Sequence, residues 1–238
     1  MTVTFLLLHG GGHGGWCWRD VVDLLRRAGH RVYAPTLTGY GDREHLRACV
    51  RDFATFVLDV VNVVEHEELR DVHIVAHSQG GVLAPRVAEA IPDRIAQVTW
   101  LAGVVLADGE RLADVVPPAT SLPGTTDHPD GSRTVDVDAW VAAVMPEGTA
   151  QQRRWVATHF RPSPHLARVE PGRLSAFLAL GLPTAFIAAT EDVCVPIDLA
   201  RRFTGRLPGA KTVDVAAGHE LMVTRPAETA AAILAAQA

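Results

Sequence analysis

The sequence predicts an α/β fold, with a mainly parallel sheet of about six strands and helices on both faces. Short apolar runs alternate with longer segments whose apolar residues recur at helical spacing, the pattern of strand–helix–strand units. This alternation is interrupted once, in the middle of the chain, and then resumes. The 238 residues are enough for one domain with a sizeable core, and 48% hydrophobic with 21% charged residues is typical of a globular protein.

Residues 1–107 contain four expected strands and three expected helices. The apolar run at 3–8 precedes a glycine cluster, and the helical segment that follows ends at Gly29, a typical C-cap residue. The other expected elements of this part are strands at 31–34, 72–76 and 95–105 and helices at 16–28, 50–66 and 79–91.

Residues 108–171 break the pattern. They are rich in Pro, Asp, Thr and Gly and contain only two helical patterns, near 136–145 and 149–159. So long a stretch without strands is more typical of an inserted lid than of a core. Strands are then expected at 183–189 and 211–215, and helices at 196–204 and 226–236. We therefore predict an α/β core made of residues 1–107 and 172–238 and a lid made of residues 108–171.

Charge and cysteine content exclude several classes of protein. The 22 Lys and Arg residues stand against 27 Asp and Glu residues, and no basic cluster suits a nucleic-acid backbone. Cys17, Cys49 and Cys194 are too scattered for a disulfide framework and are expected to be free thiols. No apolar run approaches a membrane span or a signal-peptide core. All basic residues except Lys211 are arginines, as in GC-rich bacterial genomes. We predict a cytoplasmic bacterial protein, monomeric or homodimeric, without membrane or nucleic-acid partners.

The strongest motif is His-Ser-Gln-Gly-Gly at 77–81, between an expected strand and an expected helix. This arrangement predicts a nucleophile elbow, a sharp turn that lifts the hydroxyl of Ser78 above the carboxyl end of the sheet. The turn needs small residues two positions before and after the serine, and Ala76 and Gly80 provide them. A serine N-cap on an ordinary turn is the alternative, and downstream partners decide against it.

A serine hydroxyl becomes nucleophilic only when a base takes its proton and an acid orients that base. With this type of elbow the acid follows a late strand, where the sequence has Glu191 and Asp192, and the base follows the last strand, where it has His219. Asp192 and His219 are 27 positions apart, enough for one helix and one strand between them. At this point both carboxylates remain candidates for the acid.

The glycine cluster at 9–18 follows the first strand, and its backbone N–H groups can face a ligand. An oxyanion hole needs two such donors, and we predict the N–H groups of Gly11 and Gln79. The cluster lacks the Gly-Lys-Ser/Thr sequence of a phosphate loop. His9 and His13 have a spacing that aligns metal ligands only on a helix, which the glycines disfavour. We therefore expect neither a metal nor a cofactor.

These motifs together resemble the α/β-hydrolase superfamily, in particular the plant methylesterases and hydroxynitrile lyases and their bacterial carboxylesterase relatives. The resemblance rests on the segments at 9–18, 28–32, 77–81, 190–192 and 218–222 and covers the two ends of the chain. It implies that Ser78, Asp192 and His219 form a catalytic triad, with Asp192 preferred over Glu191. It also implies that the N–H groups of Gly11 and Gln79 form the oxyanion hole.

Two positions depart from the hydroxynitrile lyases that the chain resembles. At the position of Gly10 those enzymes carry a threonine. At the position of Glu220 they carry a lysine, which stabilises the departing cyanide. A carboxylate there would oppose an anionic leaving group. We predict a serine carboxylesterase that hydrolyses a small carboxylic ester, such as a methyl or aryl ester, through an acyl-enzyme on Ser78. The alternatives are a lyase, decarboxylase or cofactor-free oxygenase that uses Ser78 and His219 differently, and a non-catalytic ligand receptor.

Aromatic and apolar side chains of the expected lid and of the glycine cluster are candidates for the substrate pocket. At helical spacing each is equally suited to plain packing. The residues predicted to line the pocket are Trp16, Trp140, Met145, Trp155 and Phe160.

Overall fold

The computed structural model describes residues 1–115, 126–127, 133–162, 164, 166 and 170–238. A six-stranded sheet in the order β2-β1-β3-β4-β7-β8 forms its centre, and each neighbouring pair of strands is parallel. The predicted α/β fold is thereby confirmed. The strands are β1 (Thr4–Leu8), β2 (Arg31–Tyr33), β3 (Val72–His77), β4 (Ile95–Leu101), β7 (Thr184–Ala189) and β8 (Lys211–Val215).

The side chains of β1 show how the sheet is buried on both faces. Leu6 and Leu8 belong to one apolar cluster and Phe5 and Leu7 to the other, and all four are at most 1% exposed. This alternation follows from the two-residue period of a strand. A strand buried on both faces reads as a continuous apolar run, which is why 3–8 is recognisable in the sequence.

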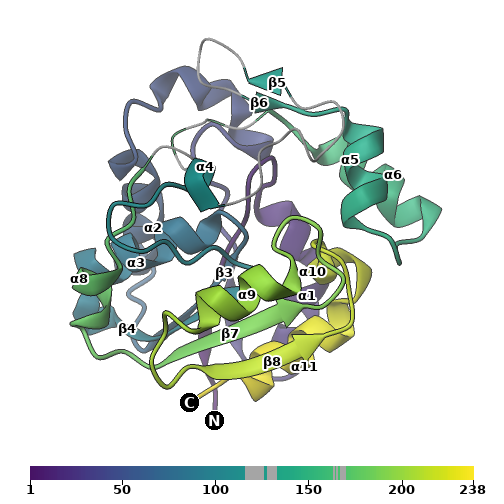
Figure 1. Ribbon diagram of the computed structural model, residues 1–238. Coiled ribbons are helices and arrows are strands. Elements are labelled where there is room, and N and C mark those ends of the chain that lie inside the picture. Colours follow the sequence, from purple (N-terminus) through teal and green to yellow (C-terminus); the bar gives the residue numbers. More distant parts are fainter. Residues whose placement is uncertain (116–125, 128–132, 163, 165, 167–169) are drawn as a thin grey trace.

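Helices cover both faces of the sheet (Figure 1). Four of them pack on the cluster that contains Leu6, namely α2 (Ala54–His66), α3 (Gly80–Ala90), α8 (Leu174–Leu178) and α9 (Ile197–Thr204). Three others pack on the cluster that contains Phe5, namely α1 (Arg19–Arg27), α10 (Leu221–Thr224) and α11 (Pro226–Ala235). The two termini lie close together at the lower edge of the view in Figure 1. Among the residues described, no helix has the length and apolar character needed to cross a lipid bilayer.

Gly29 ends α1 as expected. Its φ of 89° lies in the left-handed region, its N–H donates to the carbonyl of Arg26 at 2.9 Å, and the N–H of His30 donates to the carbonyl of Leu25 at 3.1 Å. These bonds satisfy carbonyls at the end of the helix that would otherwise lack partners. The chain can therefore turn within two residues and enter β2.

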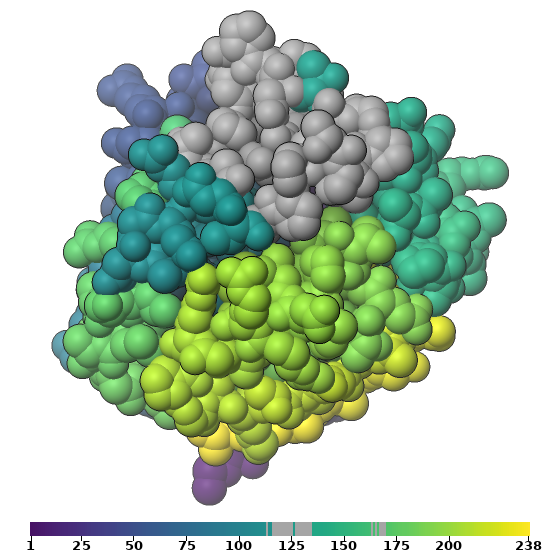
Figure 2. All heavy atoms as spheres, viewed as in Figure 1, coloured from purple at the N-terminus to yellow at the C-terminus, as the bar shows by residue number. Residues whose placement is uncertain are grey.

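The segment 108–171 contains both helices expected there, α5 (Val137–Val144) and α6 (Ala150–His159). A capping box at Thr149 and Gln152 defines the start of α6. The segment also contains the short helix α4 (Leu112–Val115) and an antiparallel pair of short strands, β5 (Thr126–Asp127) and β6 (Arg133–Thr134), which the sequence pattern did not predict. In the space-filling view α5 and α6 form the teal lobe beside the yellow-green C-terminal part (Figure 2).

Two differences from the sequence prediction have local causes. The strand expected to run to residue 105 ends at Leu101, because Ala102 has a φ of 44° and the chain turns there. A nine-residue 3₁₀ segment, η2 (Gly41–Cys49), occupies a region for which no element was expected. Its backbone angles depart from helical values at Arg43, so it consists of short turns joined at a kink rather than of one regular helix.

Candidate active site

Ser78 lies between β3 and α3 in a strained backbone conformation. Its φ is 52°, one of four positive values among the described non-glycine residues. Its N–H donates to the carbonyl of Leu101 and its own carbonyl accepts from the N–H of Val104, so β4 and the chain that follows it hold the turn. Strain of this kind persists only where the surrounding structure imposes it, and it places the Ser78 hydroxyl at the carboxyl edge of the sheet.

Two glycines are required beside Ser78. A Cβ on Gly80 would lie 2.8 Å from the carbonyl oxygen of His9, and a Cβ on Gly10 would lie 2.8 Å from the Cβ of Ser78. Both distances are shorter than non-bonded contacts allow, and at Gly80 the obstacle is backbone. The small residue predicted two positions after the serine is therefore explained by the approach of the loop after β1.

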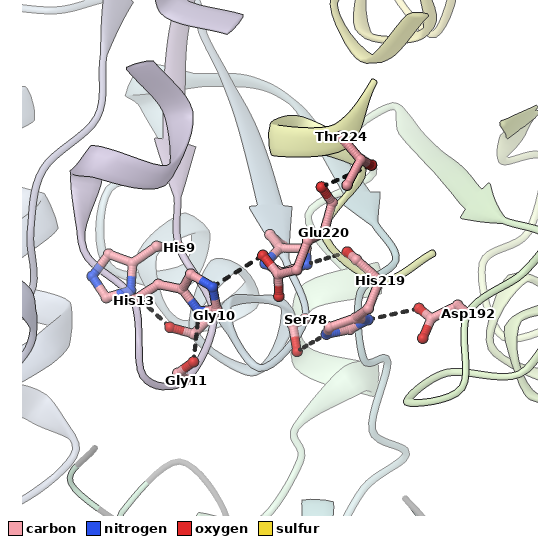
Figure 3. Close-up of polar contacts among 10 residues, drawn as sticks. His9, Gly10, Gly11, His13, Ser78, Asp192, His219, Glu220 and Thr224 are labelled. Atoms are coloured by element: carbon pink, nitrogen blue, oxygen red, sulfur yellow. Dashed lines mark hydrogen bonds and ion pairs between the residues drawn. The ribbon is translucent and has the colours of Figure 1, made fainter. Parts of the chain in front are cut away.

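Ser78, His219 and Asp192 form a continuous hydrogen-bonded chain (Figure 3). The Ser78 hydroxyl donates to Nε2 of His219 at 2.9 Å, and Nδ1–H of His219 donates to Oδ2 of Asp192 at 2.7 Å. The other oxygen of Asp192 accepts from the N–H groups of Cys194 and Val195, at 2.6 and 3.0 Å. These N–H groups fix the carboxylate, which in turn fixes the tautomer of the imidazole that a general base requires.

The structure distinguishes the two candidate acids. Asp192 is 5% exposed and contacts His219, whereas the Glu191 side chain is exposed. Burial of His219 opposes its protonation, but the negative charges of Asp192 and Glu220 outweigh burial and raise the pKa of His219 above its usual value. The imidazole is therefore a stronger base than a free histidine.

Gly11 and Gln79, whose N–H groups are the predicted oxyanion donors, are neighbours in the structure. A Cβ on Gly11 would be 2.9 Å from the side-chain oxygen of Gln79, so the glycine loop passes directly beside the start of α3. Nδ1–H of His9 donates to the carbonyl of Gly10 at 2.8 Å, and its Nε2 accepts from the N–H of Leu37 at 3.1 Å. The Gly10 carbonyl and the Gly11 N–H belong to one planar peptide and point in opposite directions. By holding that carbonyl, His9 orients the Gly11 N–H.

Replacing His9 with alanine tests this orientation. If the Gly11 N–H serves a transition-state oxyanion, H9A is expected to lower kcat by about 100-fold with little change in KM, the size seen when one oxyanion donor is lost. Steady-state kinetics on a p-nitrophenyl ester measure both constants. H73A is the matched control, because His73 is a partly buried histidine at the start of β3, the opposite end from Ser78. Equal kcat values for H9A and H73A would contradict this role.

Three further side chains beside the predicted triad belong to the same polar cluster. Nε2–H of His77 donates to the carbonyl of His219 at 3.0 Å, and burial lowers the pKa of His77 to about 3, so this ring is neutral. Nδ1–H of His13 donates to the carbonyl of Gly11 at 2.7 Å, and its Nε2 lies 3.0 Å from a carboxylate oxygen of Glu220. The sequence identified the positions of these residues but contained no signal for the contact between His13 and Glu220.

The segment 108–171 contacts the glycine loop through Phe160. The Phe160 ring lies where a Cβ of Gly12 would be, and the carbonyl of Gly12 accepts from the N–H of Arg161 at 3.0 Å. Gly12 also has a φ of 76°, so both its conformation and its surroundings require glycine. Trp140 lies against Phe160, with ring centroids 4.5 Å apart, and both rings approach His13. Of the predicted pocket residues, these two lie beside the oxyanion loop.

The other three predicted pocket residues have different surroundings, although Trp16 also stacks on His13, with ring centroids 5.2 Å apart. Trp16 and Trp155 meet edge to face, with centroids 5.1 Å apart, and both line an outer groove between α6, the 3₁₀ turn η1 (Gly15–Trp18) and η2. Met145 is fully buried in the apolar cluster that contains Phe5. A role of these three residues in substrate binding stays a prediction.

A second contact of the same segment reaches the loop that carries His219. The Glu147 carboxylate accepts from the N–H of Gly218 at 3.1 Å and from the hydroxyl of Thr224. Gly218 is also required for packing, since a Cβ there would lie 2.5 Å from the carbonyl of Val144. The segment 108–171 therefore contacts both loops that flank Ser78.

Two groups of side chains among the described residues are close enough to bind a metal ion, and both include His219. Both ring nitrogens of His219 already hold hydrogen bonds to Ser78 and Asp192. Binding a metal would break one of these bonds. The geometry thus suits proton transfer between Ser78 and His219 better than metal coordination.

Comparisons with known proteins agree with the fold. The model of the alpha/beta hydrolase family matches residues 5–232. A carbendazim-hydrolyzing esterase from Nocardioides sp. is 32% identical over 95% of this chain and 96% of its own length. A pyrethroid hydrolase from Sphingobium wenxiniae is 29% identical over 98% of this chain and 87% of its own length.

The fold is also found in solved structures. An extracellular alpha/beta-hydrolase from a Paenibacillus species, described as homologous to tobacco salicylic acid binding protein 2, superimposes with a TM-score of 0.84. It is 22% identical, and the match covers 98% of both chains. At this identity the likeness concerns the fold.

Proposed function

Since this chain belongs to the alpha/beta hydrolase family and is a carboxylic ester hydrolase, we propose that it is a serine esterase that forms an acyl-enzyme on Ser78. The observation that carries the proposal is the hydrogen-bonded chain from the Ser78 hydroxyl through His219 to Asp192. The left-handed conformation of Ser78 supports it, because an ordinary N-cap serine has no need of that strain.

The chemistry follows from these positions. His219 takes the Ser78 proton on Nε2 while Oγ forms a bond to the ester carbonyl carbon, and the carbonyl oxygen becomes an oxyanion. The N–H groups of Gly11 and Gln79 stabilise this oxyanion. As the bond to the alcohol oxygen breaks, His219 returns the proton to the leaving alcohol. Water, deprotonated by His219, then releases the acid and restores the Ser78 hydroxyl.

We propose a small ester as substrate, such as a methyl or aryl ester, bound between the glycine loop and a lid formed by residues 108–171. Phe160 and Trp140 are suited to one wall, because Phe160 packs on Gly12 and Trp140 packs on Phe160. Two relatives act on carbendazim and on pyrethroids. A panel of methyl esters, aryl esters, carbendazim and a pyrethroid is therefore the appropriate first screen.

Two features favour ester hydrolysis over cyanide release. A threonine in place of Gly10 would bring its Cβ to 2.8 Å from that of Ser78, so this loop has no room for it. The Glu220 carboxylate is fully buried and faces His13, and it offers no cation to a departing anion.

The acyl-enzyme provides the direct test. Mixing the protein with excess p-nitrophenyl acetate is expected to give a burst of about one p-nitrophenol per protein, and acid quenching should leave an acetyl group on the peptide that contains Ser78. A fluorophosphonate probe should label the same peptide and abolish turnover. Hydrolysis without a burst, label or adduct would contradict covalent catalysis and favour an acid–base role for Ser78 and His219.

A further inference from the structure

His13 differs from the other two histidines around the glycine loop in what its ring nitrogens face. His9 and His77 each donate from one nitrogen to a carbonyl, and burial lowers the pKa of His9 to about 4. In His13, Nδ1 faces the Gly11 carbonyl at 2.7 Å and Nε2 faces the Glu220 carboxylate at 3.0 Å. Both oxygens are acceptors, so a neutral ring would direct a lone pair at one of them. Only a ring with a proton on each nitrogen satisfies both acceptors at once.

The buried Glu220 carboxylate requires a positive charge beside it to stay ionised. Its side chain is 0% exposed, and among the described residues no hydrogen bond reaches either of its carboxylate oxygens. The His13 ring, with Nε2 at 3.0 Å, is the basic group that its carboxylate faces. Burial alone would raise the pKa of Glu220, but the contact with His13, together with the nearby rings of His77 and His219, outweighs burial and lowers that pKa to about 2.

The pair joins two loops from distant strands. His13 follows β1, the second strand of the sheet, and Glu220 follows β8, the edge strand at the other side. In Figure 3 no polar contact joins His13 or Glu220 to Ser78. On one side His13 holds the Gly11 carbonyl, and on the other Glu220 is the residue directly after His219.

We infer that His13 and Glu220 form a buried ion pair that positions the oxyanion loop relative to the catalytic histidine. The inference rests on the proposed function of Gly11 and His219. In the transition state the oxyanion and the His219 imidazolium develop together, so the two loops must keep a fixed separation as charge appears on both. His13 and Glu220 are positioning residues, because neither contacts the reacting atoms.

Three variants test the pair: E220Q, H13Q and the double variant H13Q/E220Q. E220Q preserves the size of the side chain and leaves the bond between His13 and Gly11 in place, so kcat is expected to fall by about 10-fold. H13Q removes that bond and should lower kcat by about 100-fold, with KM within about threefold for both variants. The double variant should lose no more than H13Q, because the two residues act as one unit. Inhibition by a trifluoromethyl ketone, which forms a tetrahedral oxyanion adduct, should weaken in parallel with kcat/KM.

The pH profile separates positioning by a charged pair from a merely structural role. The ionisable groups that face His219 from the surrounding elements are Asp192, Cys194, His77, Glu220 and, through the Gly218 N–H, Glu147. Activity rises with pH as His219 loses its proton. Removing the negative charge in E220Q should lower the pKa of His219 and move this rise of kcat/KM to lower pH. Removing the positive charge in H13Q should move it to higher pH. Shifts in opposite directions support the charged pair, and unchanged profiles would overturn it.

The control is E110Q, which breaks the partly buried pair between Glu110 and Arg206 on another part of the molecule. It is expected to lower Tm and leave kcat, KM and the pH profile unchanged. If E220Q and H13Q behave like E110Q, the inference is overturned, while fluorophosphonate labelling of the unmodified protein at Ser78 still supports the proposed function. If the unmodified protein is not labelled, the proposed function itself fails.

A measurement on the unmodified protein remains decisive if H13Q does not fold. Nitrogen NMR of histidine-labelled protein should show, apart from His219, one solvent-protected ring that carries a proton on both nitrogens. Neutral shifts for every ring would overturn the inference.

Discussion

Replacing Ser78 with alanine is expected to lower kcat by at least about 10⁴-fold, because only the oxyanion donors and substrate binding then remain. KM for the same ester should change little, since the Ser78 hydroxyl acts on the carbonyl carbon during reaction rather than in binding. Steady-state kinetics with a p-nitrophenyl ester measure the loss, and fluorophosphonate labelling should disappear with it. An S78A variant that keeps a tenth of the original kcat would exclude Ser78 as the nucleophile.

The backbone strain at Ser78 supplies an internal control for folding. Alanine suffers the same strain at a φ of 52°, so S78A should have nearly the same Tm as the unmodified protein. Glycine is not strained at this φ, so the free energy of unfolding of S78G should exceed that of S78A by about 1 kcal/mol. Both variants should be equally inactive. S175A, at an exposed serine of α8, should keep full activity. This pattern would separate the loss of the hydroxyl from a general effect on the fold.

Replacing Asp192 with asparagine is expected to lower kcat near neutral pH by about 10⁴-fold. Two backbone N–H groups, from Cys194 and Val195, point at one side-chain oxygen of Asp192. The asparagine must keep its oxygen there, so its NH₂ group faces Nδ1 of His219. That nitrogen then becomes the acceptor, and the proton moves to Nε2, which can no longer take the proton of Ser78.

Two measurements check the D192N prediction. Burial lowers the pKa of His219, and the Asp192 carboxylate is the largest influence that raises it. The pKa of His219 should therefore fall in D192N. The remaining activity should rise with pH, because hydroxide then takes the place of the missing base. E191Q is the matched control, because Glu191 is adjacent but exposed, and its kcat should stay within about twofold of the original. A large loss in E191Q with little loss in D192N would reverse the assignment of the acid.

Most of the fold could be predicted from the sequence, because buried parallel strands and amphipathic helices leave different periods in it. All six strands of the sheet and the helices α5 and α6 were expected close to where they lie. The errors occur where local pattern is weak. The 3₁₀ segment at Gly41–Cys49 has no regular apolar period, and the end of β4 depends on the positive φ of Ala102, which no sequence rule requires of an alanine.

The site was predictable to different degrees. Ser78 and His219 could be identified from their own turns, because the elbow and the loop after the last strand are local features. Phe160 was one of several aromatic residues, and only packing against Gly12 distinguishes it. Trp16 and Trp155 looked equally suitable in the sequence, yet they line an outer groove.

The sequence by itself determined the order of the elements and which residues can act as nucleophile, base and acid, since these depend on residue type and short spacing. Residue type and spacing left Glu191 and Asp192 open, and the family resemblance favoured Asp192. The structure gives the physical reason, because adjacent side chains point in different directions and only Asp192 reaches His219. The pairing of His13 with Glu220 was also decided by tertiary structure alone. These residues are 207 positions apart. Only the packing of the loops after β1 and β8 brings the buried Glu220 carboxylate against the buried His13 ring.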